Sequence, residues 1–123
     1  MSEPVHAQVQ PLPSHDGWVL RCTEYPEVIL HLKTLDHLGP KALAAIASAA
    51  NWSDTTGKAV DFEYPRGPLT LYQVTREPDG ALSCNQVPGV RLSGQSQTRD
   101  IVHSIALATG SPPDSVGITF EPF

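Results

Sequence analysis

A short pattern occurs twice in this chain of 123 residues, and the repetition constrains the fold more than any other feature. The segments CTEYPEV (22–28) and CNQVPGV (84–90) both place a proline four residues after the cysteine and a valine two residues later. The two copies begin 62 positions apart (84 − 22). Self-similarity at a fixed spacing is the usual sign of a structural unit that occurs more than once. We therefore expect a duplicated fold unit.

The residues around the first copy predict the elements of that unit. Apolar and polar residues alternate before and after the cysteine, which is typical of strands with one buried face. Tyr25-Pro26 is expected to bend the chain, and Gly39-Pro40 precedes a run of strong helix formers that ends near Asn51. The expected elements are strands at 5–12, 18–23 and 28–32, a helix at 40–50 and a strand at 59–64.

The second copy repeats this order. Leu82 and Cys84 correspond to Leu20 and Cys22, and Val87-Pro88-Gly89 is expected to form the matching bend. Thr98 is a suitable N-cap for a second helix, which Gly110 would end. The expected elements are strands at 69–74 and 80–84, a helix at 98–109 and a strand at 116–120.

Each half has about 60 residues and one helix, and a unit of that size is only marginally stable alone. We therefore expect an α+β protein made of two tandem β-β-β-α-β units, residues 1–66 and 67–123. A second copy would cover the apolar surface that one helix leaves open. The units would then form a pseudo-twofold pair that shares one compact core, like an isologous dimer within one chain.

Composition and charge exclude several classes of function. The net charge is −5, and no run of Lys or Arg could follow a phosphate backbone, so autonomous nucleic-acid binding is not expected. No stretch has the roughly 18 apolar residues that a membrane span needs, and the first residues do not resemble a signal peptide. We expect a cytoplasmic protein whose cysteines are reduced.

The sequence contains no clear catalytic or metal site. Cys22 and Cys84 lack the close spacing of zinc ligands and share strand faces with apolar residues, so both are expected to be buried thiols. The alternative is that a pseudo-twofold brings them within bridging reach. The five histidines are scattered, and Asp61 and Glu63 are expected to face solvent. We therefore predict no catalytic residues, no metal and no cofactor.

Three aromatic residues are candidates for contact with a partner, because aromatic side chains dominate interface hot spots. They are Trp52, Tyr25 and Trp18. Trp52 follows the predicted helix amid polar residues and is the best surface candidate. Trp18 shares a strand face with Leu20 and Cys22, so a core position competes with a binding role.

The segment GWVLRCTEYPEV (17–28), followed by a helix and a strand, resembles the HicB-like antitoxin family. Gly17-Trp18 fits the opening of that family's second strand, and Tyr25-Pro26 and Val87-Pro88-Gly89 fit its bend. Ser93, Gly94 and Thr98 fit the residues that precede the family helix. The resemblance implies a truncated ribonuclease-H-like fold in each half and a habit of binding proteins.

The chain departs from the family pattern in three ways. Glu27 stands in place of the bend glycine of the first half, where the Gly-x-Thr lead-in to the helix is also missing. The antitoxins usually append a DNA-binding segment, and we expect none here.

These observations predict a non-catalytic, HicB-like protein-binding module, an antitoxin-type inhibitor or regulator of a protein partner. An acidic protein favours a small, basic partner such as an HicA-type toxin. The alternative is a small enzyme or ligand-binding protein that uses the cleft between the two halves. A third interpretation is an oligomerising structural domain with open sheet edges. The chain itself is expected to be a monomer or a homodimer.

Overall fold

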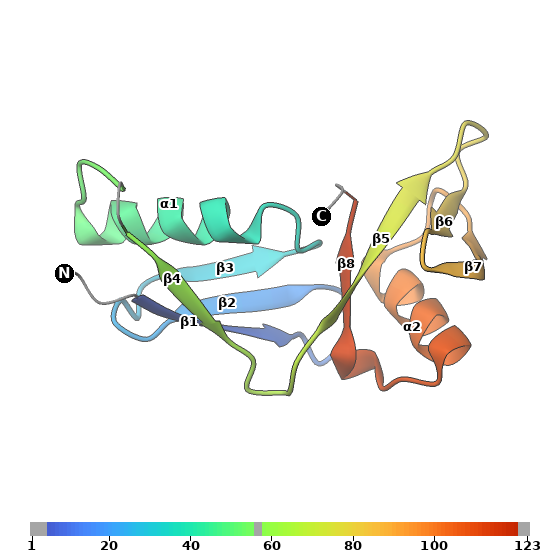
Figure 1. Ribbon diagram of the computed structural model, residues 1–123, viewed down its shortest axis with the longest axis horizontal. Helices are drawn as coiled ribbons and strands as arrows, with labels where there is room; N and C mark the ends of the chain where they lie inside the picture. Colours follow the sequence, from blue (N-terminus) through green and yellow to red (C-terminus); the bar gives the residue numbers. More distant parts are fainter. Residues whose placement is uncertain (1–4, 56–57, 121–123) are drawn as a thin grey trace.

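The computed structural model describes residues 5–55 and 58–120 and contains two four-stranded sheets, each accompanied by one long helix (Figure 1). The first unit comprises β1 (Val5–Pro11), β2 (Trp18–Cys22), β3 (Ile29–Leu32), α1 (Leu38–Ala50) and β4 (Val60–Glu63). The second comprises β5 (Thr70–Arg76), β6 (Leu82–Cys84), β7 (Val87–Leu92), α2 (Thr98–Thr109), the short 3₁₀ helix η1 (Pro113–Ser115) and β8 (Val116–Thr119). The predicted α+β class and the twofold occurrence of the element order are confirmed.

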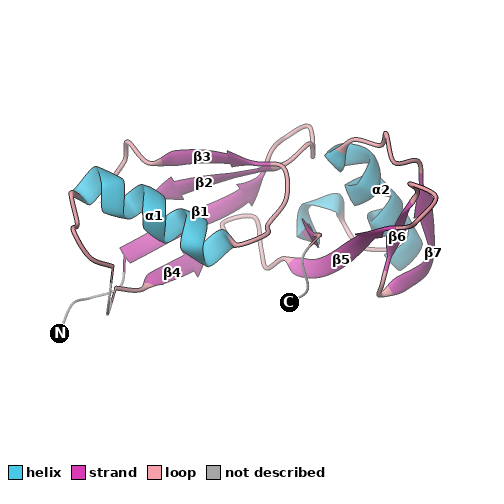
Figure 2. Cartoon of the chain, turned by 90° about the horizontal axis from the view of Figure 1, so that it is seen from above, coloured by secondary structure: helices cyan, strands magenta, loops and turns pink. Residues whose placement is uncertain are grey.

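The two sheets have the same topology. Their strand orders are β3-β2-β1-β4 and β7-β6-β5-β8. The first strand of each unit pairs in parallel with the last strand, and the other pairs are antiparallel. A parallel pair needs a long crossover connection, and α1 and α2 lie in these crossovers. Figure 2 shows α1 lying along one face of the first sheet.

The period-two pattern places side chains as predicted. In β1 and β2 the residues Val5, Ala7, Val9, Trp18, Leu20 and Cys22 are all buried. Asp61 and Glu63 in β4 are exposed. Cys22 and Cys84 are buried free thiols, as expected for small apolar side chains on the inner face.

The predicted bend of the second copy is wrong. Pro88 and Gly89 lie inside strand β7, and the turn occurs instead at Asn85 and Gln86. The register shifts beside Cys84, which pairs directly with Val87. Because β7 is an edge strand, a proline there need not remove a ladder hydrogen bond. In the first copy, by contrast, Tyr25 and Pro26 do lie in the turn before β3.

The end of α1 agrees with the sequence, but the start of α2 does not. Asn51 ends α1 in the left-handed conformation, and Gly110 ends α2 in the same way. Thr98, however, is not the N-cap of α2. Gln97 takes that position, and the Asp100 carboxylate accepts the Gln97 N–H at 3.0 Å. The Thr98 hydroxyl instead donates to a carbonyl of the first unit, which makes it part of the contact between units.

The two units meet along a seam built from the segment after β3. The Leu35 N–H donates to the Ile118 carbonyl at 2.7 Å, and Asp36 accepts the Phe120 N–H at 2.8 Å. Leu35 is 5% exposed. A Cβ placed on Gly117 of β8 would lie 2.9 Å from the Cδ1 atom of Leu35, so the two residues are in close contact. Strand β8 is therefore buried on both faces, and buried residues of the two units form one contact cluster.

The seam is not symmetric among the described residues. It joins the β1–β2 turn and the segment after β3 of the first unit to α2, η1 and β8 of the second. An isologous contact would occur twice, with the roles of the two units exchanged. The hydrogen bonds of the seam in residues 5–55 and 58–120 include no such exchanged pair, so they give the predicted pseudo-twofold no support.

Candidate functional site

A groove of about 310 Å³ runs between the edge strand β3 and helix α1. Its walls are formed by Glu27, Val28, Ile29, Leu30, Ala45, Ser48 and Ala49. Ile29 is 44% exposed, a large fraction for an apolar strand residue. Because β3 is the last strand of its sheet, no described strand pairs with its outer edge. We call this surface the β3 groove. It combines open backbone groups with apolar side chains.

Two of the three predicted contact residues lie together at one end of the β3 groove. The rings of Tyr25 and Trp52 meet edge to face, with centroids 6.2 Å apart, and the Lys58 ammonium lies 4.8 Å from the Trp52 ring. The Val28 N–H donates to the Tyr25 carbonyl at 2.9 Å and the Trp52 N–H to the Ala47 carbonyl at 2.9 Å, which places the pair beside the groove. The side chains of this aromatic pair are partly buried.

Trp18, the third candidate, is in the core. Only 1% of its surface is exposed, and its indole Nε1 has no hydrogen-bond partner among the described residues. Its place on the inner face with Leu20 and Cys22 explains the burial. Trp18 is therefore a core residue and not a contact residue, and Tyr25 and Trp52 are the two candidates that remain.

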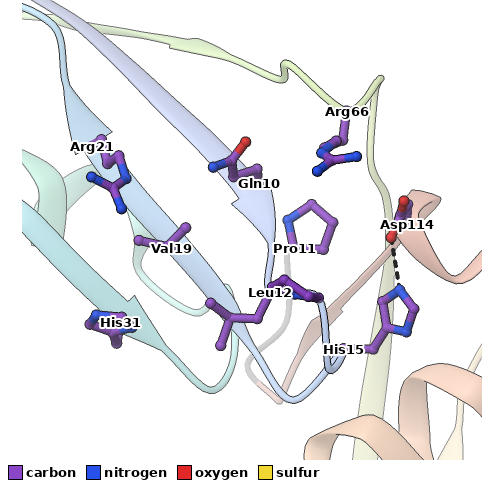
Figure 3. Close-up of a pocket in the computed structure, with 10 residues that line it drawn as sticks. Gln10, Pro11, Leu12, His15, Val19, Arg21, His31, Arg66 and Asp114 are labelled. Carbon is purple, nitrogen blue, oxygen red and sulfur yellow. Dashed lines mark hydrogen bonds and ion pairs between the residues drawn. The ribbon is translucent and has the colours of Figure 1, made fainter.

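A second site is a cleft of about 390 Å³ that reaches from the first sheet to η1 of the second unit (Figure 3). It is lined by Gln10, Pro11, Leu12, Pro13, His15, Val19, Arg21, His31, Arg66 and Asp114. Pro11, Leu12 and Val19 form its apolar middle. Arg21 and His31 lie on one side, and Arg66, His15 and Asp114 on the other (Figure 3).

His15 links the cleft to the second unit through two hydrogen bonds. Its Nε2 lies 2.8 Å from Asp114 Oδ1, and its Nδ1 lies 3.0 Å from His103 Nε2. With a proton on Nε2, His15 donates to Asp114, and a neutral Nδ1 accepts from His103. His15 itself adopts a left-handed conformation with φ 60, which is uncommon outside glycine and typical of constrained positions.

The sequence does not predict this hydrogen-bonded chain, because no short motif contains its three residues. His15 and His103 are separated by 88 positions, and His15 and Asp114 by 99. From their positions in the sequence alone, the histidines look scattered. Only the packing of α2 and η1 against the β1–β2 turn brings the three groups together. No group of three or more His, Cys, Asp or Glu within residues 5–55 and 58–120 is arranged to hold a metal ion.

A separate ion pair on the first sheet joins His6 in β1 to Glu24. His6 Nδ1 lies 2.7 Å from Glu24 Oε1, and the His6 N–H donates to Glu24 Oε2 at 2.9 Å. The side-chain hydrogen bond to Glu24 raises the pKa of His6 above its ordinary 6.5. The His6 backbone N–H is the main reason that the pKa of Glu24 falls below its ordinary 4.5.

This pair predicts a defined pH window. The raised pKa of His6 gives stability that is complete below the unfolded value of 6.5 and lost as pH rises through the folded value. The lowered pKa of Glu24 gives stability that is present above 4.5 and lost as pH falls through its folded value. His6→Gln should therefore destabilise the protein most between those two values.

Urea unfolding at a series of pH values measures this window. The difference in free energy of unfolding between wild type and His6→Gln should become smaller well above pH 6.5. His31→Gln is the control, since His31 is an exposed strand histidine for which the described residues show no ion pair. A difference that is independent of pH would contradict the expectation.

None of the helices in the described ranges is long and apolar enough to cross a bilayer. No protein-family model matches the chain, and neither a curated protein nor a solved structure matches it at a significant level.

Proposed function

We propose that the protein is a non-catalytic protein-binding module of the HicB-like antitoxin type, which holds an extended segment of a protein partner in the β3 groove. The observation that carries the proposal is the open edge of β3 beside an exposed apolar side chain, Ile29. An open strand edge presents unpaired N–H and C=O groups that another chain can pair with.

Binding would occur by strand addition. The partner segment would continue the sheet beyond β3 through main-chain hydrogen bonds, and alternate side chains would enter the groove. Ala45 and Ala49 support this mode, since small residues on α1 leave room between helix and strand. The aromatic pair Tyr25 and Trp52 lies where it could anchor one end of the segment, and its rings bring large contact area at low entropy cost.

Charge adds a preference for the partner. The chain carries a net charge of −5, which would speed association with a basic protein and disfavour acidic ones. Glu27 lines the groove itself and would suit a lysine or arginine of the bound segment. A small basic partner, the kind that the family resemblance implies, is therefore the occupant we propose.

The test compares two substitutions of the same kind at different places. Ile29→Lys puts a charge at the open edge of β3, while Leu107→Lys puts the same charge on α2, where Leu107 is 87% exposed. We expect Ile29→Lys to weaken binding to a partner identified by affinity capture at least about tenfold, because a charge would be desolvated in an apolar contact. Leu107→Lys should leave binding unchanged.

Hydrogen exchange supplies the second measurement. On binding, the amides within residues 29–32 that point away from β2 should gain protection, since strand addition gives them new hydrogen bonds. Loss of binding in Leu107→Lys but not in Ile29→Lys would overturn the proposal and place the interface on α2.

The ligand-binding alternative also has a specific observation in its favour, namely the polar cleft between the units. Its arginines suggest recognition of an anion rather than the carboxylate-held metal of a ribonuclease-H-type enzyme.

A further inference from the structure

We propose that the cleft between the two units binds a small organic anion, with a phosphate or carboxylate group held by Arg21 and Arg66 and an apolar body resting on Pro11, Leu12 and Val19. The proposal does not depend on the β3 groove, which is formed by a different set of residues. A volume of about 390 Å³ is within the range of ordinary small-ligand sites.

The charge of the cleft is opposite to that of the chain. The protein has a net charge of −5, yet two of its arginines border this one cleft. Neither Arg21 nor Arg66 forms an ion pair with any described residue. Arg91, in contrast, is paired with Asp79. Two arginines without a carboxylate partner, facing a common hollow, are available to a ligand.

The acidic groups nearby do not cancel this charge. Asp114 is the one carboxylate in the lining, and it already accepts a hydrogen bond from His15. Asp61 and Glu63 lie on β4 and do not line the cleft. His31 adds a further ring nitrogen on the Arg21 side. The cleft therefore offers mainly donors and positive charge.

The arrangement of the donors fits an oxyanion. Figure 3 shows Gln10 between Arg21 and Arg66, above the apolar residues of the middle. A guanidinium presents its N–H groups in a planar fork that matches two oxygens of a carboxylate or phosphate. The Gln10 amide could donate to a third oxygen. A carboxylate and a phosphate monoester present the same oxyanion chemistry to these groups.

The apolar middle indicates that the ligand has a body as well as a charged head. Pro11 and Leu12 keep part of their surface exposed in the cleft, beside Val19 of β2. A flat ring could cover this surface and remove it from water. An inorganic anion could use the arginines but not this surface, so it should bind more weakly.

The proposal is tested with phenyl phosphate, benzoate, benzamide and inorganic phosphate as probes, with amide chemical shifts of the full chain followed by NMR at low salt. Phenyl phosphate or benzoate should shift the amide signals of residues 10, 12, 19–21 and 66, and the probe that binds more tightly identifies the head group. Benzamide, which lacks the charge, and inorganic phosphate, which lacks the ring, should each bind at least about fivefold more weakly.

Matched variants separate the site from general charge. Arg21→Gln and Arg66→Gln should each weaken the better probe at least about fivefold. Lys41→Gln on α1 removes the same charge from an exposed position outside the cleft and should leave the affinity unchanged. Equal binding of benzamide, unchanged affinity in both arginine variants, or equal loss in Lys41→Gln would overturn the proposal. Both arginine side chains are exposed, so the variants should remain folded.

Discussion

Replacing Gly17 with alanine is expected to destabilise the protein by about 3 kcal/mol. Gly17 has φ 140, a conformation that residues with a Cβ rarely adopt. A Cβ there would also lie 2.4 Å from the carbonyl oxygen of Leu32. Leu32 lies in β3 and pairs with Trp18 of β2. Its carbonyl oxygen therefore cannot move without disturbing the sheet.

Gly39→Ala is the matched control. Gly39 lies within α1, and a Cβ there would have no atom within 4 Å apart from its chain neighbours and the backbone of the helix itself. Alanine restricts the unfolded chain more than glycine does, but a Cβ is disfavoured in a helical residue that precedes a proline, here Pro40. The two effects oppose each other, so the stability of this variant should stay within about 1 kcal/mol of wild type. Urea unfolding followed by circular dichroism measures both variants. Equal midpoints for Gly17→Ala and wild type would contradict the close approach of these strands.

Leu35→Ala is expected to cost about 2–4 kcal/mol, because it removes a buried side chain from the seam and leaves a cavity there. Leu35 is 5% exposed and contacts the second unit beside Gly117. Its backbone hydrogen bond to Ile118 would remain. The seam would therefore be weakened without being cut, and the two units should unfold less cooperatively.

The protein carries a natural reporter for this effect. Trp18 and Trp52, its two tryptophans, belong to the first unit, so fluorescence follows that unit while circular dichroism follows both. In wild type the two transitions should coincide, and in Leu35→Ala they should separate. Leu107→Ala, at a position 87% exposed, should change neither transition. If the two transitions of Leu35→Ala also coincide, as those of Leu107→Ala should, then Leu35 does not couple the unfolding of the two units.

Much of the fold could be predicted because its signals are local. Alternation placed Trp18, Leu20 and Cys22 on one buried face, and helix formers with Asn51 and Gly110 marked the helices and their ends. The bend at Pro88 was misplaced because a proline is compatible both with a turn and with an edge strand. Which of these it occupies depends on the neighbour of β7, and that is not a local property.

The candidate sites were predicted less well, for the same reason. Tyr25 and Trp52 were identified as aromatic residues near a turn and a helix end, but their contact and the groove beside them depend on α1 lying along β3. Arg21 and Arg66 carried no signal at all. They lie on a strand and in a linker, and each is unremarkable until the cleft brings them to a common border.

Local sequence patterns are enough to predict the duplication, the α+β class, the inner faces of the strands and the burial of both cysteines. Apolar side chains recur every two residues in a strand and every three to four residues in a helix, and this pattern can be read from the sequence without knowing the tertiary contacts. Three features depend on how the chain packs in three dimensions. They are the asymmetric seam at Leu35, the hydrogen-bonded chain of His103, His15 and Asp114, and the two binding surfaces, namely the β3 groove and the cleft. Each of these joins residues far apart in the chain, and their meeting depends on how helices and sheets pack, which no local pattern records.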